Sequence, residues 1–223
     1  MVDTHYYYFC VMEENIAILI ADLSGYTALT ETHGASSAAD MIDRYTEIVG
    51  KCLVGDCHLH SRTGDEVVII SRLADHLTAT AIMLIQNTSG ENNFLQIHGG
   101  LHYGKILKRN ENYFGTTINL ASRIASKANP GTFWCSLDYI DALEKKEAFT
   151  FQPRGKHNFK NVSEEIEVSE LVIRDSKSFH VDPVCRMLIN EKENAVQHPK
   201  EENVFFCSQH CFDIYLKNNP EIE

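Results

Sequence analysis

The sequence has no long apolar run. Its longest uninterrupted one, Ile16 to Ala21, is far shorter than the roughly 20 residues that a membrane-spanning helix needs. The first residues, Met1 to His5, carry no basic segment of the kind that begins a secretory signal, and no internal repeat or low-complexity segment is evident. We therefore expect a globular, cytoplasmic protein that does not enter a membrane.

The chain also has little positive charge. It contains 20 Lys and Arg residues against 31 Asp and Glu, a formal net charge of -11 at pH 7, and it has no basic stripe that could follow a nucleic-acid backbone. The same negative field opposes a free polyphosphate unless cations lie between the two. Composition thus argues against a nucleic-acid partner and is compatible with a metal-bound nucleotide.

Cysteine is present in an odd number, seven. In a chain with no secretion signal, such thiols are better explained as reduced residues or metal ligands than as a disulfide framework. Four of them occur singly, and we expect them to be core residues: Cys10, Cys52, Cys57 and Cys135. The run Cys57-His58-Leu59-His60 looks like a ligand set, but strand alternation puts both histidines on one face and the cysteine on the other.

The apolar pattern predicts an α+β domain. At 223 residues, 43% of them hydrophobic, the chain can bury one medium core and a smaller one. The pattern predicts helices over 26–51 (divided at Gly34), 73–86 and 118–128, and strands over 16–21, 57–61, 66–71, 94–103, 105–108, 132–136, 156–160 and 166–173. We expect a ferredoxin-like α/β sandwich, with helices on one face of a mainly antiparallel sheet.

Three polar motifs follow one another in the N-terminal half of the chain: Ala21-Asp22-Leu23-Ser24-Gly25-Tyr26-Thr27, Thr63-Gly64-Asp65-Glu66 and Asn119-Leu120-Ala121-Ser122-Arg123. Asp22 and Asp65 are expected at adjacent strand ends, where their carboxylates can hold divalent cations against phosphates. Asn119 and Arg123 lie four apart and project from one helix face. Singly, these residues could be a helix cap, a turn residue and a solvated face, but their joint occurrence favours one site.

In order and spacing, these motifs resemble the catalytic domain of class III nucleotidyl cyclases. The resemblance implies that Asp22 and Asp65, with the carbonyl of Leu23, bind two Mg²⁺ or Mn²⁺ ions per active site. It also implies contacts to phosphate oxygens, from the amides of Ser24, Gly25, Tyr26 and Thr27 and from the side chain of Lys160.

The Asn/Arg motif has its own role in that family. Asn119 would orient the ribose, and Arg123 would hold the charge that develops on the α-phosphate. Family members build each site from two subunits, with the aspartates from one and the Asn/Arg pair from the other. A homodimer with two sites is therefore implied.

The positions that read the base depart from the usual pattern. Adenylyl-type members carry a lysine four positions before the second metal aspartate and an aspartate seven before the ribose-binding asparagine. Here these positions hold Ser61 and Asn112, which can still hydrogen-bond a base edge but carry no charge. ATP is the first choice of substrate, and asparagine is compatible with more than one base.

The last part of the chain resembles a second family. Asp182-Pro183-Val184-Cys185-Arg186-Met187, followed by Phe206-Cys207-Ser208-Gln209-His210-Cys211, is similar to the YHS domain, a small metal-associated module. We place the cyclase-like domain at 1–173, a polar linker at 174–179 and this module at 180–223. Cys185, Cys207 and Cys211 are then candidate ligands for a soft ion, copper or zinc, and His198 or His210 could add a fourth. Arg186 replaces the usual glycine, which would strain this turn if φ is positive.

Two functions are consistent with the motifs. The first is a nucleotidyl cyclase that makes a 3′,5′-cyclic nucleotide and pyrophosphate at a homodimer interface, with metal binding by the module as a regulator. The alternative is an inactive, cyclase-like nucleotide-binding protein coupled to metal sensing or handling. A third possibility, metal handling on a scaffold that binds no nucleotide, is also open. The run Tyr6-Tyr7-Tyr8-Phe9 is expected to be an edge strand or a dimer contact.

Overall fold

The computed structural model describes residues 11–109, 112–173 and 179–220. The predictions for Tyr6 to Phe9, for Cys10 and for most of the linker fall outside these residues. Cys52, Cys57 and Cys135 are buried, as expected of core residues.

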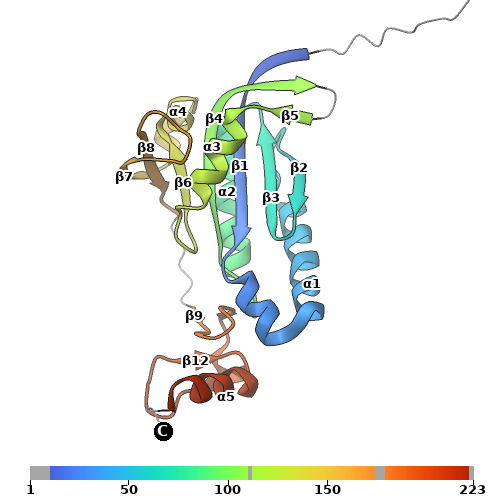
Figure 1. Ribbon diagram of the computed structural model, residues 1–223, viewed down its shortest axis with the longest axis vertical. Helices are drawn as coiled ribbons and strands as arrows, with labels where there is room; N and C mark the ends of the chain where they lie inside the picture. The colour runs from blue at the N-terminus through green and yellow to red at the C-terminus, as the bar shows by residue number, and fades with distance from the viewer. Residues whose placement is uncertain (1–10, 110–111, 174–178, 221–223) are drawn as a thin grey trace, which may run out of the picture.

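One large sheet organises the first 173 residues (Figure 1). Its strands run in the order β2-β3-β1-β4-β6-β8-β7, and β5 pairs with the end of β4. Neighbours are antiparallel except β4 and β6, which are parallel. The strands are β1 (Val11–Leu23), β2 (His58–Thr63), β3 (Glu66–Ser71), β4 (Ile97–Arg109), β5 (Asn112–Phe114), β6 (Phe133–Ser136), β7 (Phe151–His157) and β8 (Ile166–Leu171).

Helices cover both faces of this sheet, so the expectation of helices on one face is wrong. The odd residues of β1, such as Leu19, pack with α1 (Tyr26–Cys52), α2 (Ala74–Ser89) and α4 (Leu137–Asp141). The even residues, such as Ile18, pack with Ala121 and Ala125 of α3 (Thr116–Ala125) on the opposite face. A strand that is apolar at every position is typical of burial on both faces, and β1 follows that rule.

Strand β4 is also longer than expected. Residues 94–103 and 105–108 were predicted as two strands, but Ile97–Arg109 forms one, and Gly104 continues the ladder opposite Ile16. A side chain at Gly104 would meet Thr117 and His102 at 3.1–3.3 Å. This glycine therefore makes room beside α3 rather than ending a strand.

Helix α1 bends at Gly34, as the sequence predicts. Gly34 has φ 81 and ψ 171, a conformation that is essentially restricted to glycine, so a first helical segment ends at His33. Gly34→Ala should cost about 1–3 kcal/mol of unfolding free energy, although a Cβ there would meet no atom within 4 Å. Gly50→Ala is the matched control: its surroundings are equally open and its helix is regular, so it should stabilise by about 0.5–1 kcal/mol. Urea unfolding checks both, and equal effects would contradict the argument.

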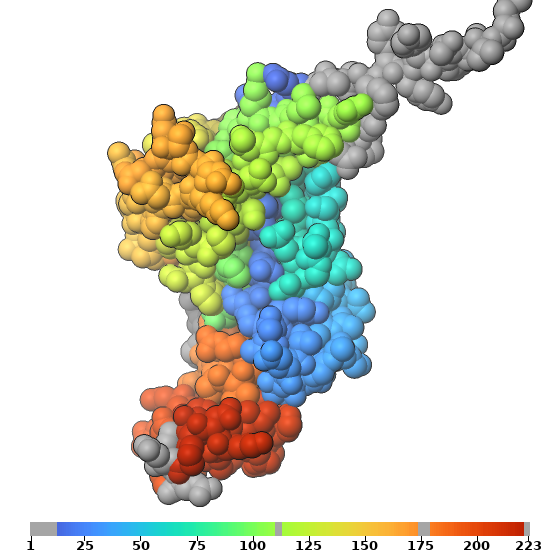
Figure 2. All heavy atoms as spheres, in the orientation of Figure 1, coloured from blue at the N-terminus to red at the C-terminus, as the bar shows by residue number. Residues whose placement is uncertain are grey.

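The C-terminal segment forms a small lobe at one end of the molecule (Figures 1 and 2). It contains two short hairpins and a helix: β9 (His180–Val181), β10 (Leu188–Ile189), β11 (Val196–Gln197), β12 (Phe205–Phe206) and α5 (Gln209–Asn218). Its core is small and consists of Cys185, Phe206 and Cys211 with partly buried apolar neighbours. This segment also contains a short 3-10 turn at Lys192–Asn194, and another such turn, Lys146–Ala148, lies in the larger domain between α4 and β7.

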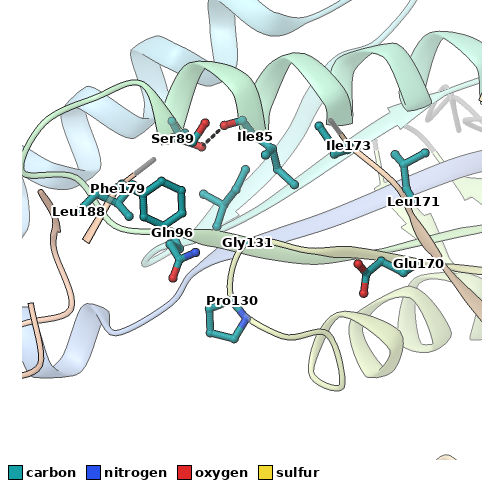
Figure 3. A pocket seen from close by; sticks show the side chains of 12 residues that line it. Ile85, Ser89, Gln96, Pro130, Gly131, Glu170, Leu171, Ile173, Phe179 and Leu188 are labelled. Atoms are coloured by element: carbon teal, nitrogen blue, oxygen red, sulfur yellow. Dashed lines mark hydrogen bonds between the residues drawn. The ribbon is translucent and has the colours of Figure 1, made fainter. Parts of the chain in front are cut away.

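This segment lies at the end of the sheet where β1 ends and α1 begins (Figure 1). Leu188 donates its amide to the carbonyl of Phe94 at 2.6 Å and accepts from the amide of Asn93 at 2.9 Å, and Leu95 forms a β-bridge with Met187. Beside this junction, a cavity of about 180 Å³ is lined by Ile85, Leu171, Phe179 and Leu188, among others (Figure 3). The C-terminal segment therefore packs directly on the domain that the large sheet and its helices form.

Candidate functional site

Two carboxylates meet at one end of the sheet. Asp22 lies near the end of β1, and Asp65 lies in the turn between β2 and β3. The register Ala21↔Val67 brings that turn beside the end of β1. The two carboxyl groups are hydrogen-bonded to each other, which requires a shared proton when no cation is present.

Burial disfavours ionisation of both carboxyls, and the charge of Asp22 adds to this effect at Asp65. Burial, then the hydrogen bond and charge of Asp22, raises the pKa of Asp65 to about 6, and burial also raises the pKa of Asp22. The adjacent Glu66 has a raised pKa for the same reason, burial followed by the charge of Asp65. A cation bound between these groups would favour their ionised form, and carboxylate oxygens are ligands that Mg²⁺ or Mn²⁺ prefers.

The proton and the cation should compete for Asp65. Mn²⁺ affinity of the nucleotide-free protein is expected to fall as pH drops through about 6 and to level off above it, where the carboxyl is ionised. Electron paramagnetic resonance of free Mn²⁺ measures this directly. In Asp65→Asn, affinity should be weaker and the step near this pH should disappear. A wild-type affinity that is flat across this range would contradict the assignment.

Two further residues beside the pair were missed by sequence reasoning. His98 is opposite Asp22 in the β1–β4 register, and its Nδ1 is 2.8 Å from the hydroxyl oxygen of Ser24. Tyr45 of α1 is fully buried, and its hydroxyl has no hydrogen-bond partner among the described residues. Burial, then the charges of Asp22 and Asp65, raises the pKa of Tyr45. Neither residue belongs to a local motif, so only the pairing and packing reveal them.

The turn after Asp22 leads into α1 without a capping side chain. Gly25 is the N-cap, with φ 95 in the left-handed region, and no acidic residue lies in the first turn. The amide of Leu23 donates to its neighbour Asp22 at 3.0 Å, and the amide of Ser24 donates to Gln96 at 2.7 Å. The first amides of α1 after Gly25, from Tyr26 and Thr27 onward, are thus available to an anion at a helix N-terminus.

The Asn/Arg pair is not brought to the carboxylates within one chain. α3 packs on β4 and β1 through Ala121 and Ala125, which turns the exposed Asn119 and half-exposed Arg123 away from the sheet. Within the described part of the chain, neither side chain has a hydrogen-bond or ion-pair partner. By the alternation of β1, Asp22 lies on the same sheet face as α3.

Of the other predicted positions, Lys160 and Ser61 lie on the surface. Lys160 is exposed and follows Phe159, which packs in a cluster with Ile124 of α3. Ser61 is exposed on β2, where a bulge separates it from Leu59. Asn112 pairs with Arg109 at the start of β5. Ser61 and Asn112, the two positions predicted to read the base, belong to strands that contact each other, because the rings of His60 on β2 and Tyr113 on β5 are 5.0 Å apart.

A second group of donor atoms lies in the C-terminal segment. The Sγ atom of Cys207 is 3.5 Å from those of both Cys185 and Cys211. His33 joins this group from α1: its Nε2 is 3.4 Å from Cys211 Sγ and 3.6 Å from Cys207 Sγ, and all four donor atoms lie within 4.8 Å of one another. Hydrogen bonds from Cys185 and Cys207 hold the pKa of Cys211 well below its usual range, at about 4. One of these sulfurs is therefore ready to act as a thiolate.

The histidines considered from sequence are used differently. Nδ1 of His198 accepts from the amides of Lys200 and Glu201, and its ring packs edge-on against two aromatic rings of α5. His210 contacts the carbonyl of Thr32 at 3.2 Å. Neither belongs to the donor group.

Asp182 organises the cysteine turns. It is fully buried, and its two oxygens accept from the amides of Val184 and Cys185 on one turn and of Cys207 on the other. Arg186, in the position of the usual glycine, has φ 68. The predicted strain at this residue is thus present, at a cost of about 1–2 kcal/mol.

Comparison with known proteins agrees with this geometry. Residues 11–174 match the Adenylate and Guanylate cyclase catalytic domain. The chain belongs to this family. An uncharacterised protein of Mycobacterium tuberculosis is 31% identical over 134 residues, covering 60% of this chain and 35% of that protein. An adenylate cyclase of Glutamicibacter nicotianae is 29% identical over 117 residues, covering 52% of this chain and 29% of its own. The cyclase-family chain therefore spans about a third of the length of these relatives.

Solved cyclases share the fold. The adenylyl cyclase CyaB from P. aeruginosa superposes with a TM-score of 0.62 at 18% identity, over 74% of this chain and 97% of that one. The guanylate cyclase domain of RhGC from Catenaria anguillulae, solved with GTP, gives 0.62 at 17% identity, over 74% and 100%. Among the described residues of this cyclase-family chain, no helix is long and apolar enough to cross a membrane.

Proposed function

We propose that this protein converts a nucleoside triphosphate, with ATP as first choice, into a 3′,5′-cyclic nucleotide and pyrophosphate in a homodimer. The observation that carries the proposal is the pairing of Asp22 with Asp65, at the strand end that leads into an uncapped helix N-terminus. Membership of the cyclase family supports the same chemistry.

In this proposal, Asp22, Asp65 and the Leu23 carbonyl hold Mg²⁺ or Mn²⁺. Such ions would neutralise the triphosphate and favour ionisation of the ribose hydroxyl. The amides of Gly25, Tyr26 and Thr27 and the side chain of Lys160 bind phosphate oxygens, whereas the predicted contact from the Ser24 amide is not available, because this amide donates to the carbonyl of Gln96. The 3′ oxygen forms the new bond to the α-phosphorus, pyrophosphate leaves with the electron pair of the broken bond, and the hydroxyl proton passes to water.

A partner copy supplies the remaining groups. Asn119 would orient the ribose, and Arg123 would stabilise charge on the α-phosphate. Both side chains point away from their own sheet and have no partners among the described residues, which supports this role. Asp22 and α3 lie on the same face of the sheet, so a second copy that packs against this face would place its Asn119 and Arg123 near the carboxylates. Ser61 and Asn112 would contact the base without charge, so we expect weaker discrimination between bases than a charged pair provides.

Product analysis tests the enzymatic proposal. Purified protein is given each of the four common triphosphates with Mn²⁺, and at least one should yield a cyclic product and pyrophosphate, while Asp22→Ala should yield none. Nucleotide binding without product would instead favour the non-catalytic alternative. The absence of any nucleotide-induced rise in melting temperature would favour a plain metal-handling scaffold.

We further propose that residues 180–223, after a linker at 174–179, form a metal-binding module of the YHS type. Cys185, Cys207 and Cys211 are its ligands for zinc or copper. Their close approach and the fixed turns around Asp182 support this assignment, as does the small core, which a metal would help to stabilise.

A further inference from the structure

The proposed metal site lies at a junction, not inside the C-terminal segment alone. Three of its four donor atoms come from that segment, and the fourth comes from His33 of α1. His33 is the last residue before the bend at Gly34, so the end of the first helical segment, Tyr26 to His33, faces the thiols. Sequence gives no signal for this, because His33 and Cys185 are 152 positions apart in the chain.

The distances fit a tetrahedral ion. Zn–S bonds of about 2.3 Å and a Zn–N bond of about 2.0–2.1 Å at tetrahedral angles place sulfur and nitrogen about 3.6 Å apart and two sulfurs about 3.8 Å apart. Nε2 of His33 is 3.4 and 3.6 Å from two sulfurs, and Cys207 Sγ is 3.5 Å from each of the other two sulfurs. The widest pair is within 4.8 Å, so a closure of about 1 Å completes the geometry.

We infer that His33 is the fourth ligand of a Cys₃His site, so that a bound ion joins α1 to the C-terminal segment. This inference rests on the proposed metal-binding role of Cys185, Cys207 and Cys211. A tetrahedral Cys₃His set is a common structural zinc site, and Zn²⁺ is the ion that the four donors fit. Cu(I), which thiolates alone can satisfy, would have less need of His33.

The junction lies beside the nucleotide-binding turn. Arg186, next to the ligand Cys185, packs on Gly25 so closely that a Cβ on Gly25 would be 2.5 Å from the Arg186 Cβ. Gly25 begins the helical segment that ends at His33. The ion therefore fixes one end of this segment while Arg186 contacts the other. Metal binding and the turn that is expected to hold phosphates thus share one short piece of helix.

Metal titration of the full chain tests the inference. Competition with a chromophoric chelator gives Zn²⁺ affinity, and Co²⁺ absorption reports the ligand set. His33→Ala should weaken Zn²⁺ binding by about tenfold or more and change the Co²⁺ spectrum. His33→Cys should restore tight tetrahedral binding. His210→Ala is the matched control, an exposed histidine on the same junction, and should change neither result.

Hydrogen exchange provides a second readout. In the wild type, Zn²⁺ should increase protection of residues 26–33, and in His33→Ala it should not, although the segment 180–223 still responds. Unchanged Zn²⁺ affinity and Co²⁺ spectrum in His33→Ala, with binding lost in Cys207→Ser, would overturn the role of His33 and leave the three-cysteine site intact. A wild type that binds neither Zn²⁺ nor Cu(I) would overturn the metal site itself. Neither result would decide the proposed cyclase activity, which the product analysis tests separately.

Discussion

Arg123→Ala is expected to lower kcat by about a thousandfold or more, because an arginine on the transferring phosphoryl group contributes on that scale. The side chain is half-exposed and has no partner among the described residues of its own chain, so its loss should leave the fold and the melting temperature unchanged. Arg72→Ala is the matched control. Arg72 is an exposed arginine that follows β3, at the opposite end of this strand from Asp65. Steady-state kinetics on both variants checks this, and an Arg123→Ala enzyme with nearly normal kcat would contradict the proposed role.

Asp65→Asn should strongly reduce turnover and yet stabilise the metal-free protein. Activity should fall by about a hundredfold to a thousandfold, since a cation ligand is lost. For stability, burial and the neighbouring Asp22 raise the pKa of Asp65 to about 6 in the folded state, from about 3.9 for an unperturbed aspartate. The folded state binds the proton more tightly, so stability falls as pH rises through this range. At pH 7 the ionised group is a net cost, which asparagine removes.

Thermal unfolding in the presence of a chelator measures the second effect. At neutral pH, Asp65→Asn should melt above the wild type, and the difference should shrink as pH falls toward about 4, the pKa of an unperturbed aspartate, because both side chains are then neutral in the folded state. Mn²⁺ should reverse the order by stabilising only the wild type. Asp40→Asn, at an exposed position on α1, should show neither effect. If Asp65→Asn instead lowered the melting temperature at neutral pH, the ionised Asp65 would stabilise the fold, which would contradict this account.

The sequence predicts those parts of the site whose signals are local. Asp22 and Asp65 each border an apolar strand, and the hairpin around Gly64 returns the chain beside β1, so their convergence follows from short-range pattern. The positive φ at Arg186 also agrees with the sequence prediction, which rests on the proposed resemblance to a module that has glycine at this position. The bend at Gly34 belongs to the same group, since a single glycine in a helical pattern often marks an irregularity.

Other features depend on long-range packing that no local signal specifies. The second helical layer was recognisable in principle from β1, whose continuous apolar run has no polar face. Gly104 was mistaken for a break because, in sequence alone, a glycine that interrupts a strand and one that admits a close neighbour look the same. His98 and His33 acquire their roles only through strand register and through docking of the C-terminal segment. Neither of these could be deduced without the assembled fold.

The most direct test of the account is complementation between two inactive variants. Asp65→Asn and Arg123→Ala are mixed in equal amounts under conditions that allow subunit exchange. If each site takes its carboxylates from one copy and its arginine from the other, half of the dimers are mixed and one site in each is intact, so about a quarter of wild-type activity should return. A mixture no more active than either variant alone would contradict a site shared between two copies.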